Sequence, residues 1–437
     1  MKVISYKNKK KNLIVSYKLI IMVYENRIIK AVRHMIKRER YIDRIRPFFN
    51  NELVKVLTGI RRAGKSVMLD LIREELLKEG VLSSQCIMFN FESMSTVEYR
   101  TAHSLYQEIA RRITSIEGKA YLFFDEIQEV EDWEQCINSC RVDFNCDIYI
   151  TGSNAKLLSG ELATYLGGRY VEFVVYPFSF SEYMEARKQK EQSADLASGF
   201  NAYLTYGGMP FLTNLPDNPA ASLQYLKDLY SSVVLKDVVK RNKIRDVDIL
   251  ERIMLYVMAN VGRTFSARSI SAYFKNENRK IAPETILNYI KACADAYLFY
   301  PVKREDIIGK KLLTVNEKYY IADHGIREAV YGQNMRDVEQ TLENIVCLEL
   351  IRRGYNVTVG KYGEKEIDFI AGKQGKKIYV QVAYLLASPD TVAREFGVYA
   401  SIKDNYPKYV VSMDEMDFSQ NGIIHQNIRT FLMSNTY

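Results

Sequence analysis

Residues 59–66 read GIRRAGKS and fit the phosphate-binding pattern GxxxxGK[ST] in full. A short apolar run ends at Gly59 and a helical pattern starts at Lys65, which is the context that such a loop requires. The two glycines allow a tight turn whose backbone N–H groups point at phosphate oxygens, and a helix N-terminus favours an anion. We therefore expect a nucleotide-binding loop made of Gly59, Ile60, Arg61, Arg62, Ala63, Gly64, Lys65, Ser66 and Val67.

A second motif, YLFFDE at residues 121–126, places two acids directly after four bulky apolar residues. A buried strand that ends in two acids suits a nucleotide hydrolase with a phosphate loop nearby. We expect Lys65 to contact the β- and γ-phosphates, and Ser66 and Asp125 to hold Mg²⁺. Glu126 would orient or deprotonate the attacking water. The alternative for both acids is an acidic helix start that follows a strand.

Polar residues follow a third apolar run in TGSNA at residues 151–155. Asn154 or Ser153 could reach the γ-phosphate or the attacking water, and Ser153 could equally cap the helix that follows. Arg169, in GGRY before a further apolar run, could be a finger that stabilises charge in the transition state. A surface arginine beside a turn is the alternative.

Apolar runs alternate with amphipathic helical patterns up to about residue 180. This alternation predicts parallel βαβ units whose strands are buried on both faces. The domain so defined covers residues 35–180. Its strand-like runs are 52–59, 86–91, 120–125, 147–151 and 170–176, and its helical patterns are 65–78, 97–115 and 133–144.

The rest of the chain divides into three further regions. Residues 181–239 are mostly helical, broken by the turn signal YGGMP at 206–210, and form a lid or a connector. Residues 240–330 combine short helices with a polar hairpin, an order that suggests a winged helix. Residues 331–437 contain a helix and three strand-like runs, which predict a small α/β domain.

The composition fits a globular chain of two or three domains, since 47% of the 437 residues are hydrophobic and 26% are charged. Six cysteines without a CxxC pair and four scattered histidines argue against a zinc site. They favour a reduced, cytoplasmic protein. No apolar run reaches the roughly 20 residues that a membrane helix needs.

Positive charge is concentrated at the N-terminus, where the first 40 residues hold 12 lysines and arginines and two acids. The net charge of +8 therefore comes from this leader. We expect residues 1–34 to be a basic, poorly ordered extension. A cleaved signal peptide, or a natural start at Met22 or Met35, are the alternatives.

The runs GIRRAGKS, FFDEIQ, TGSNA, GGRY and YPFSFSEY together resemble the AAA-type ATPases of prokaryotes that carry a C-terminal domain of unknown function. The later YGGMP, LENIVCLEL, EIDFIA and YVQVAYLL match the same group. The resemblance implies an α/β fold with ATP and Mg²⁺ as cofactors. Its parts would be a P-loop AAA-like parallel sheet with helices, a helical or winged-helix region, and a small nuclease-like α/β domain.

Restriction-type nucleases, whose shape this resemblance implies for the C-terminal domain, use an Asp on one strand and Asp/Glu-x-Lys on the next, often with a Glu on the preceding helix. Glu343 and Asp368 fit two of these positions, but Gln381 and Ala383 replace the second acid and the lysine. Glutamine is a poor ligand for Mg²⁺. We therefore expect a degenerate nuclease fold in which the two acids hold strand to helix, with residual metal-dependent activity as the alternative.

Residues 240–320 carry 16 lysines and arginines against nine acids. A basic module of this type commonly meets the phosphate backbone of DNA. The helix opened by Pro283 and the hairpin at residues 303–311 are the expected contacts, and docking of a protein is the alternative.

The sequence thus predicts a Mg²⁺-dependent ATPase in which water attacks the γ-phosphate and the nucleotide state drives the attached modules. One rival is a slow, nucleotide-gated switch that changes its affinity for a protein or DNA partner. A second rival is an ATP-regulated nuclease. Self-association is also compatible with the sequence, and no membrane partner is expected.

Overall fold

The computed structural model describes residues 35–155, 166–190, 195–215, 218–277, 279–309, 311–332 and 337–434. The basic extension expected at residues 1–34 lies outside these ranges. Residues 40–437 form one compact unit, which contains both β-sheets. In the described part of the chain, no helix combines the length and the apolar character that crossing a membrane demands.

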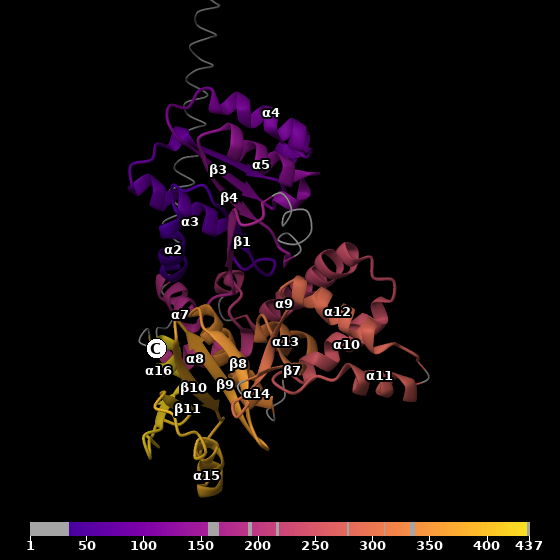
Figure 1. Ribbon diagram of the computed structural model, residues 1–437, viewed down its shortest axis with the longest axis vertical. Coiled ribbons are helices and arrows are strands. Elements are labelled where there is room, and N and C mark those ends of the chain that lie inside the picture. Colours follow the sequence, from indigo (N-terminus) through magenta and orange to yellow (C-terminus); the bar gives the residue numbers. More distant parts are fainter. Residues whose placement is uncertain are drawn as a thin grey trace, which may run out of the picture. The chain divides into compact units, whose positions relative to one another are not determined.

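Five parallel strands form the sheet of the first domain, in the order β2-β3-β4-β1-β5 (Figure 1). The predicted α/β fold with a parallel sheet is confirmed. Because the strands are parallel, the loops that leave β1, β2, β3 and β4 emerge at one edge of the sheet. The elements are β1 (Val54–Thr58), α3 (Lys65–Lys78), β2 (Cys86–Asn90), α4 (Ala102–Ile113), β3 (Ala120–Asp125), α5 (Trp133–Asp143), β4 (Cys146–Thr151) and β5 (Tyr170–Val174), with α2 (Glu39–Ile45) before them and 3₁₀ helices at Arg46–Phe48, Ser83–Gln85, Met94–Tyr99 and Ile127–Glu129.

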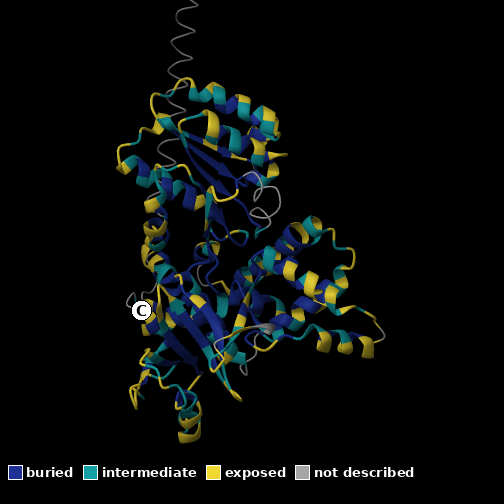
Figure 2. Ribbon diagram, viewed as in Figure 1, coloured by how far each residue is buried: buried dark blue, intermediate teal, exposed yellow. Residues whose placement is uncertain are grey.

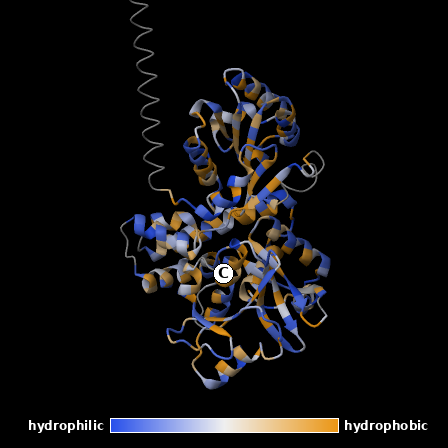
Figure 3. Cartoon of the chain, turned by 60° about the vertical axis from the view of Figure 1, so that its left-hand side comes forward, coloured by the Kyte–Doolittle hydropathy of each residue, from blue (hydrophilic) through white to orange (hydrophobic). Residues whose placement is uncertain are grey.

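The central strands β1, β3 and β4 of this sheet are almost fully buried, and most of their residues are apolar (Figure 2). Every residue of β1 and β3 is buried, and the rings of Phe89 and Phe124 stack with their centroids 5.8 Å apart. Hydrophobic and hydrophilic residues alternate along the covering helices (Figure 3). In α4 the apolar side chains of Leu105 and Ile109 are fully buried against this core.

One ion pair lies inside the sheet, between β1 and its neighbour β4. Lys55 and Asp147 pair with both side chains fully buried. The Asp147 carboxylate also accepts hydrogen bonds from Tyr149 Oη (2.8 Å) and from the Asn50 backbone N–H (2.8 Å). Removing one partner of such a pair leaves an uncompensated buried charge, which is strongly unfavourable. The pair therefore fixes β1 against β4, and with it the starting point of the loop after β1.

Helices occupy the chain after the first sheet, as expected for residues 181–239. They are α7 (Phe180–Gln189), α8 (Leu196–Tyr206), a 3₁₀ helix (Pro210–Asn214), α9 (Pro219–Ser232) and a π-helix (Val233–Lys240). The π-helix follows α9 without a break. Widened helical turns of this kind are rare and often occur at functional sites.

The YGGMP turn after α8 is held by a buried aspartate from much later in the chain. Asp323 accepts hydrogen bonds from the backbone N–H groups of Gly208 (2.7 Å) and Gly325 (3.0 Å). Its burial raises the pKa of Asp323 to about 7, although these backbone donors act in the opposite direction. Gly207 has a φ of 77°, and a Cβ there would lie 1.9 Å from Asp323 Oδ1. Only glycine fits this position.

A second sheet of seven strands has the order β12-β11-β10-β9-β8-β6-β7. Its strands β6 and β7 form an antiparallel hairpin, and β6 also pairs in parallel with β8. The hairpin expected to close the region 240–330 therefore shares one sheet with residues 356–427. The elements from residue 247 onward are α10 (Val247–Ala259), α11 (Ala267–Asn276), α12 (Pro283–Asp295), β6 (Phe299–Asp306), β7 (Lys311–Ile321), α13 (His324–Tyr331), α14 (Val338–Arg352), β8 (Asn356–Tyr362), β9 (Lys365–Lys373), β10 (Lys376–Val382), α15 (Pro389–Gly397), β11 (Lys408–Ser412), β12 (Ile424–Asn427) and α16 (Ile428–Met433).

The contact between Gly207 and Asp323 predicts a large loss of stability in Gly207→Ala. Gly168 is a matched control because its φ is 72° and nothing lies within 4 Å of a Cβ built there. Both variants place alanine at positive φ, which costs about 1 kcal/mol, and only Gly207→Ala adds about 1–3 kcal/mol of overpacking. Urea unfolding followed by circular dichroism should show this difference. Equal stabilities of the two variants would contradict the contact.

Candidate functional site

The loop between β1 and α3 has a backbone that its glycines make possible. Gly59 has a φ of 131°, and a Cβ there would lie 2.2 Å from the Val175 carbonyl oxygen. Gly64 precedes the first turn of α3 with a φ of 99°. Arg62 also has a positive φ, 67°, which is uncommon for a residue with a side chain. The loop therefore keeps its compact form at some cost in backbone strain.

Lys65, the first residue of α3, projects its side chain into this loop. The side chain is buried, and Nζ donates hydrogen bonds to the carbonyl oxygens of Gly59 (3.1 Å) and Ile60 (3.2 Å). Burial lowers the pKa of Lys65, whereas the nearby carboxylates, Glu126 first, raise it. Lys65 Nζ lies 3.8 Å from Glu126 Oε1. A buried ammonium group within this loop offers a phosphate a strong partner.

Asp125 ends β3 at the same edge of the sheet. Its Oδ1 accepts a hydrogen bond from Thr151 Oγ1 (2.7 Å), and its Oδ2 accepts one from Asn90 Nδ2 (3.1 Å). The same Thr151 oxygen accepts the backbone N–H of Glu126 (2.8 Å). Burial raises the pKa of Asp125, and hydrogen bonds from Thr151 and Ser66 lower it. This neutral, fixed donor set suits a carboxylate that holds Mg²⁺ through its water shell together with Ser66.

Glu126 follows β3 with a positive φ of 54°, and its side chain lies near that of Lys65. Ser153 Oγ donates to Glu126 Oε1 (2.7 Å), and Gln128 Nε2 donates to Oε2. Burial opposes ionisation, but Lys65 and these two donors bring the pKa of Glu126 below its usual value. The carboxylate is therefore ionised at neutral pH and can accept a proton from water.

The structure brings Lys65, Asp125 and Glu126 together, with exposed Ser66 beside Asp125. Ser153 bonds to Glu126, and the helix that it could cap falls outside the described residues. Asn154 is buried at the same edge, and its Nδ2 donates to the carbonyl oxygen of Asp237 (3.4 Å).

Arg169 lies away from the phosphate loop of its own chain. It immediately precedes β5, and the start of β5 pairs with the start of β1. The loop leaves the other end of β1, so the full length of the strand separates it from Arg169. Arg169 is exposed there. The expected finger role is therefore not available within one chain.

Four residues of the site were not identified from the sequence as functional. Asn90 and Thr151 each end a strand that flanks β3, so a polar residue closing an apolar run was the available signal. Gln128 lies in the 3₁₀ helix directly after Glu126. Asp237 lies on the π-helix, and no local pattern points to it.

Of the two acids considered for nuclease chemistry, Glu343 contacts a lysine from the hairpin. Lys318 of β7 is buried, with Nζ 3.3 Å from Glu343 Oε1 and 2.7 Å from Glu366 Oε1. Burial by itself lowers the pKa of Lys318, but the carboxylates around it, Glu343 and Asp368 among them, raise the pKa above its usual value. An internal cation thus balances the acids.

Asp368 accepts a hydrogen bond from the Val382 backbone N–H (2.8 Å). Gln381 donates to Glu395 Oε2 (3.0 Å), so its amide is used inside the domain. These contacts tie β9, β10 and α15 together.

Two family models match the chain. The family described as “AAA domain” matches residues 51–184, and “Domain of unknown function (DUF8612)” matches residues 197–337. The first match contains the phosphate loop and the parallel sheet, and it confirms the AAA-type resemblance for this domain. The nuclease-like character expected for residues 331–437 stays a prediction.

Two relatives match most of the chain. An uncharacterized protein of Haemophilus influenzae is 40% identical over 378 residues, which are 86% of this chain and 93% of the relative. An uncharacterized protein of Methanocaldococcus jannaschii is 31% identical over 368 residues, 80% of this chain and 79% of the relative. Among solved structures, the Orc1 protein of Aeropyrum pernix in complex with DNA covers 67% of this chain and 91% of its own, at 12% identity and a TM-score of 0.33. A similarity this low transfers no role.

The double role of the Thr151 hydroxyl predicts a measurable cost for Thr151→Val. The variant leaves an oxygen of Asp125 and the N–H of Glu126 without their partner, at about 1–3 kcal/mol. Thr114→Val is the control, because the exposed Thr114 hydroxyl bonds only to the Arg111 carbonyl (2.7 Å). Trp133, the one tryptophan of the chain, lies in this domain, so its fluorescence in urea reports the unfolding. Equal midpoints for the two variants would contradict the bridging role.

Proposed function

The chain, with its AAA domain, belongs to the same protein family as its Haemophilus influenzae and Methanocaldococcus jannaschii relatives, and from that premise we propose that it is a cytoplasmic, Mg²⁺-dependent ATPase. The observation that carries the proposal is the buried Lys65 ammonium group, which lies between the phosphate loop and the ionised Glu126. A triphosphate supplies the anionic charge that such a cation requires.

The roles proposed for the site residues follow from their contacts. Backbone N–H groups of residues 59–67 and Lys65 bind the phosphates. Ser66 and Asp125 hold Mg²⁺, which when bound neutralises charge on the phosphates. Glu126, oriented by Ser153 and Gln128, accepts the proton of the attacking water.

The roles proposed for Asn154 and Arg169 each require a change from the arrangement in the structure. Asn154 is at the correct edge of the sheet to meet the γ-phosphate if its bond to Asp237 is exchanged. A finger role for Arg169 requires a second copy of the chain, because its own loop lies at the opposite end of the strands.

The main rival is a slow nucleotide-gated switch that acts through partner affinity. Turnover measured with and without candidate partners separates it from a constitutive ATPase. An ATP-regulated nuclease is disfavoured by Gln381 and Ala383 and by the Lys318 cation, which already neutralises Glu343.

Lys65→Ala and Glu126→Gln should separate binding from turnover. Loss of the lysine charge should weaken ATP binding at least tenfold, about 1.4 kcal/mol, by calorimetry. Glu126→Gln keeps the shape of the side chain but loses the base, so ATP should still bind while hydrolysis falls about 10²–10⁴-fold. Wild-type affinity in Lys65→Ala would remove the loop assignment. Wild-type turnover in Glu126→Gln would show that another group activates water.

A contact with DNA is proposed for the helices and hairpin of residues 240–320, because lysines and arginines outnumber acids in this region. Part of that charge is already paired, since Arg279 contacts Asp248 and Arg304 lies 3.0 Å from Glu366. Lys303 and Lys311 are exposed, and Lys310 falls outside the described residues.

Neutralising Lys303 and Lys311 should therefore weaken DNA binding. In protein that starts at Met35, which removes the basic leader, Lys303→Gln with Lys311→Gln should lower the log–log salt slope by about one per lost contact. The exposed pair Lys376→Gln with Lys403→Gln is the control. Fluorescence anisotropy with duplex DNA measures both. If the shortened protein shows no salt-dependent binding at low ionic strength, the module is a protein-docking domain.

A further inference from the structure

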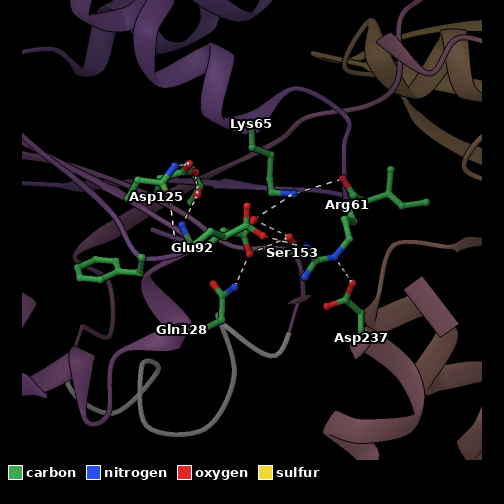
Figure 4. Close-up of polar contacts among 12 residues, drawn as sticks. Arg61, Lys65, Glu92, Asp125, Gln128, Ser153 and Asp237 are labelled. Atoms are coloured by element: carbon green, nitrogen blue, oxygen red, sulfur yellow. Dashed lines mark hydrogen bonds and ion pairs between the residues drawn. The ribbon is translucent and has the colours of Figure 1, made fainter. Parts of the chain in front are cut away.

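An ion pair joins the phosphate loop to the helical region. Arg61 lies within the loop, and its Nε is 3.0 Å from Asp237 Oδ2 on the π-helix (Figure 4). A second guanidinium nitrogen of Arg61 lies 3.1 Å from Glu92 Oε1, just after β2. The Arg61 side chain is 12% exposed and that of Asp237 is 1% exposed. The pair is therefore shielded from water, where charge interactions are stronger than at the surface.

Asp237 is also the point where other contacts from the site converge. Asn154, after β4, donates its side-chain amide to the Asp237 carbonyl oxygen (3.4 Å). Arg241, one turn further along the chain, places a guanidinium nitrogen 3.3 Å from Asp237 Oδ1. Loops from two strands thus contact one residue of the π-helix, while a neighbour in the same segment helps to balance its charge.

The pair borders a cavity that reaches the catalytic side of the sheet. The cavity has a volume of about 600 Å³, and its lining includes Arg61, Glu92, Gln128, Asp237 and Lys240. Gln128 in turn donates to Glu126. This space lets Arg61 change its partner without displacing packed side chains.

We propose that the Arg61–Asp237 ion pair couples the nucleotide state to the helical region, and that a triphosphate takes Arg61 away from Asp237. The inference rests on the proposed function, because it needs ATP in the loop. A guanidinium group binds phosphate oxygens strongly, and ATP adds a charged phosphate that ADP lacks. When Arg61 turns to the nucleotide, the buried Asp237 keeps only the ion pair with Arg241. The weaker compensation of its charge loosens the π-helix.

Backbone hydrogen exchange over residues 229–243 tests this coupling in the whole protein. It is measured without nucleotide, with ADP and with a non-hydrolysable ATP analogue, and calorimetry on the same samples establishes binding. The analogue, but not ADP, should speed exchange in this segment by about tenfold or more, while β1 and β3 stay protected. Asp237→Asn should show fast exchange in all three states.

Three comparisons identify the pair as the cause. The control Asp228→Asn, an exposed change on α9, should behave as wild type. Without nucleotide, residues 229–243 of the double variant Arg61→Gln with Asp237→Asn should exchange no faster than in Asp237→Asn alone. Each of the two changes removes the same ion pair, so the second change has nothing further to remove. Asp237→Glu, which keeps the charge, should restore part of the nucleotide dependence.

The outcomes separate the coupling from the proposed function. Nucleotide binding with equal exchange in all three wild-type states, or slower exchange with the analogue, overturns the coupling alone. Nucleotide dependence that persists in Asp237→Asn, or additive effects of the two changes, also overturns it. Absence of any nucleotide binding overturns both the coupling and the ATPase proposal.

Discussion

A buried positive charge, the ammonium group of Lys65, sets the requirements for everything around the phosphate loop. Two backbone carbonyls contact it, and Glu126 lies 3.8 Å away, so the cation is only partly balanced within the chain. The partial balance leaves room for an anion. It also explains why Glu126 needs fixed donors of its own, because an unconstrained carboxylate would close onto the lysine and occupy the place of a phosphate.

The parts of the site that lie in consecutive residues could be predicted from the sequence. The phosphate-binding pattern is eight consecutive residues, and the two acids stand at the end of the buried strand β3. Thr151 and Asn90 could not be placed in the same way. Their contacts with Asp125 depend on β4 and β2 flanking β3, and strand order is a property of the folded sheet. Strand direction would nevertheless have placed Arg169 away from the loop, since residues before and after a parallel strand lie at opposite edges.

The features that the sequence did not indicate are contacts between residues far apart in the chain. Asp237 meets Arg61 across 176 positions of sequence, from a helix whose apolar pattern gives no reason to single out its one acid. The parallel pairing of β6 with β8 likewise joins strands that β7, α13 and α14 separate in the sequence, so the local pattern showed only a hairpin. In both cases tertiary packing selects one partner from many of equal propensity.

The hairpin that completes the seven-stranded sheet limits how this chain could evolve by exchange of parts. The segment matched as a domain of unknown function ends at residue 337, yet its β6 forms ladder hydrogen bonds with β8 beyond that boundary. A gene fusion that replaced everything after residue 337 would leave β6 without its partner strand. The C-terminal segment, moved to another protein, would likewise carry a β8 without its partner. Open edges of this kind pair with other chains and aggregate. The two regions are therefore expected to be inherited together, as one unit of descent.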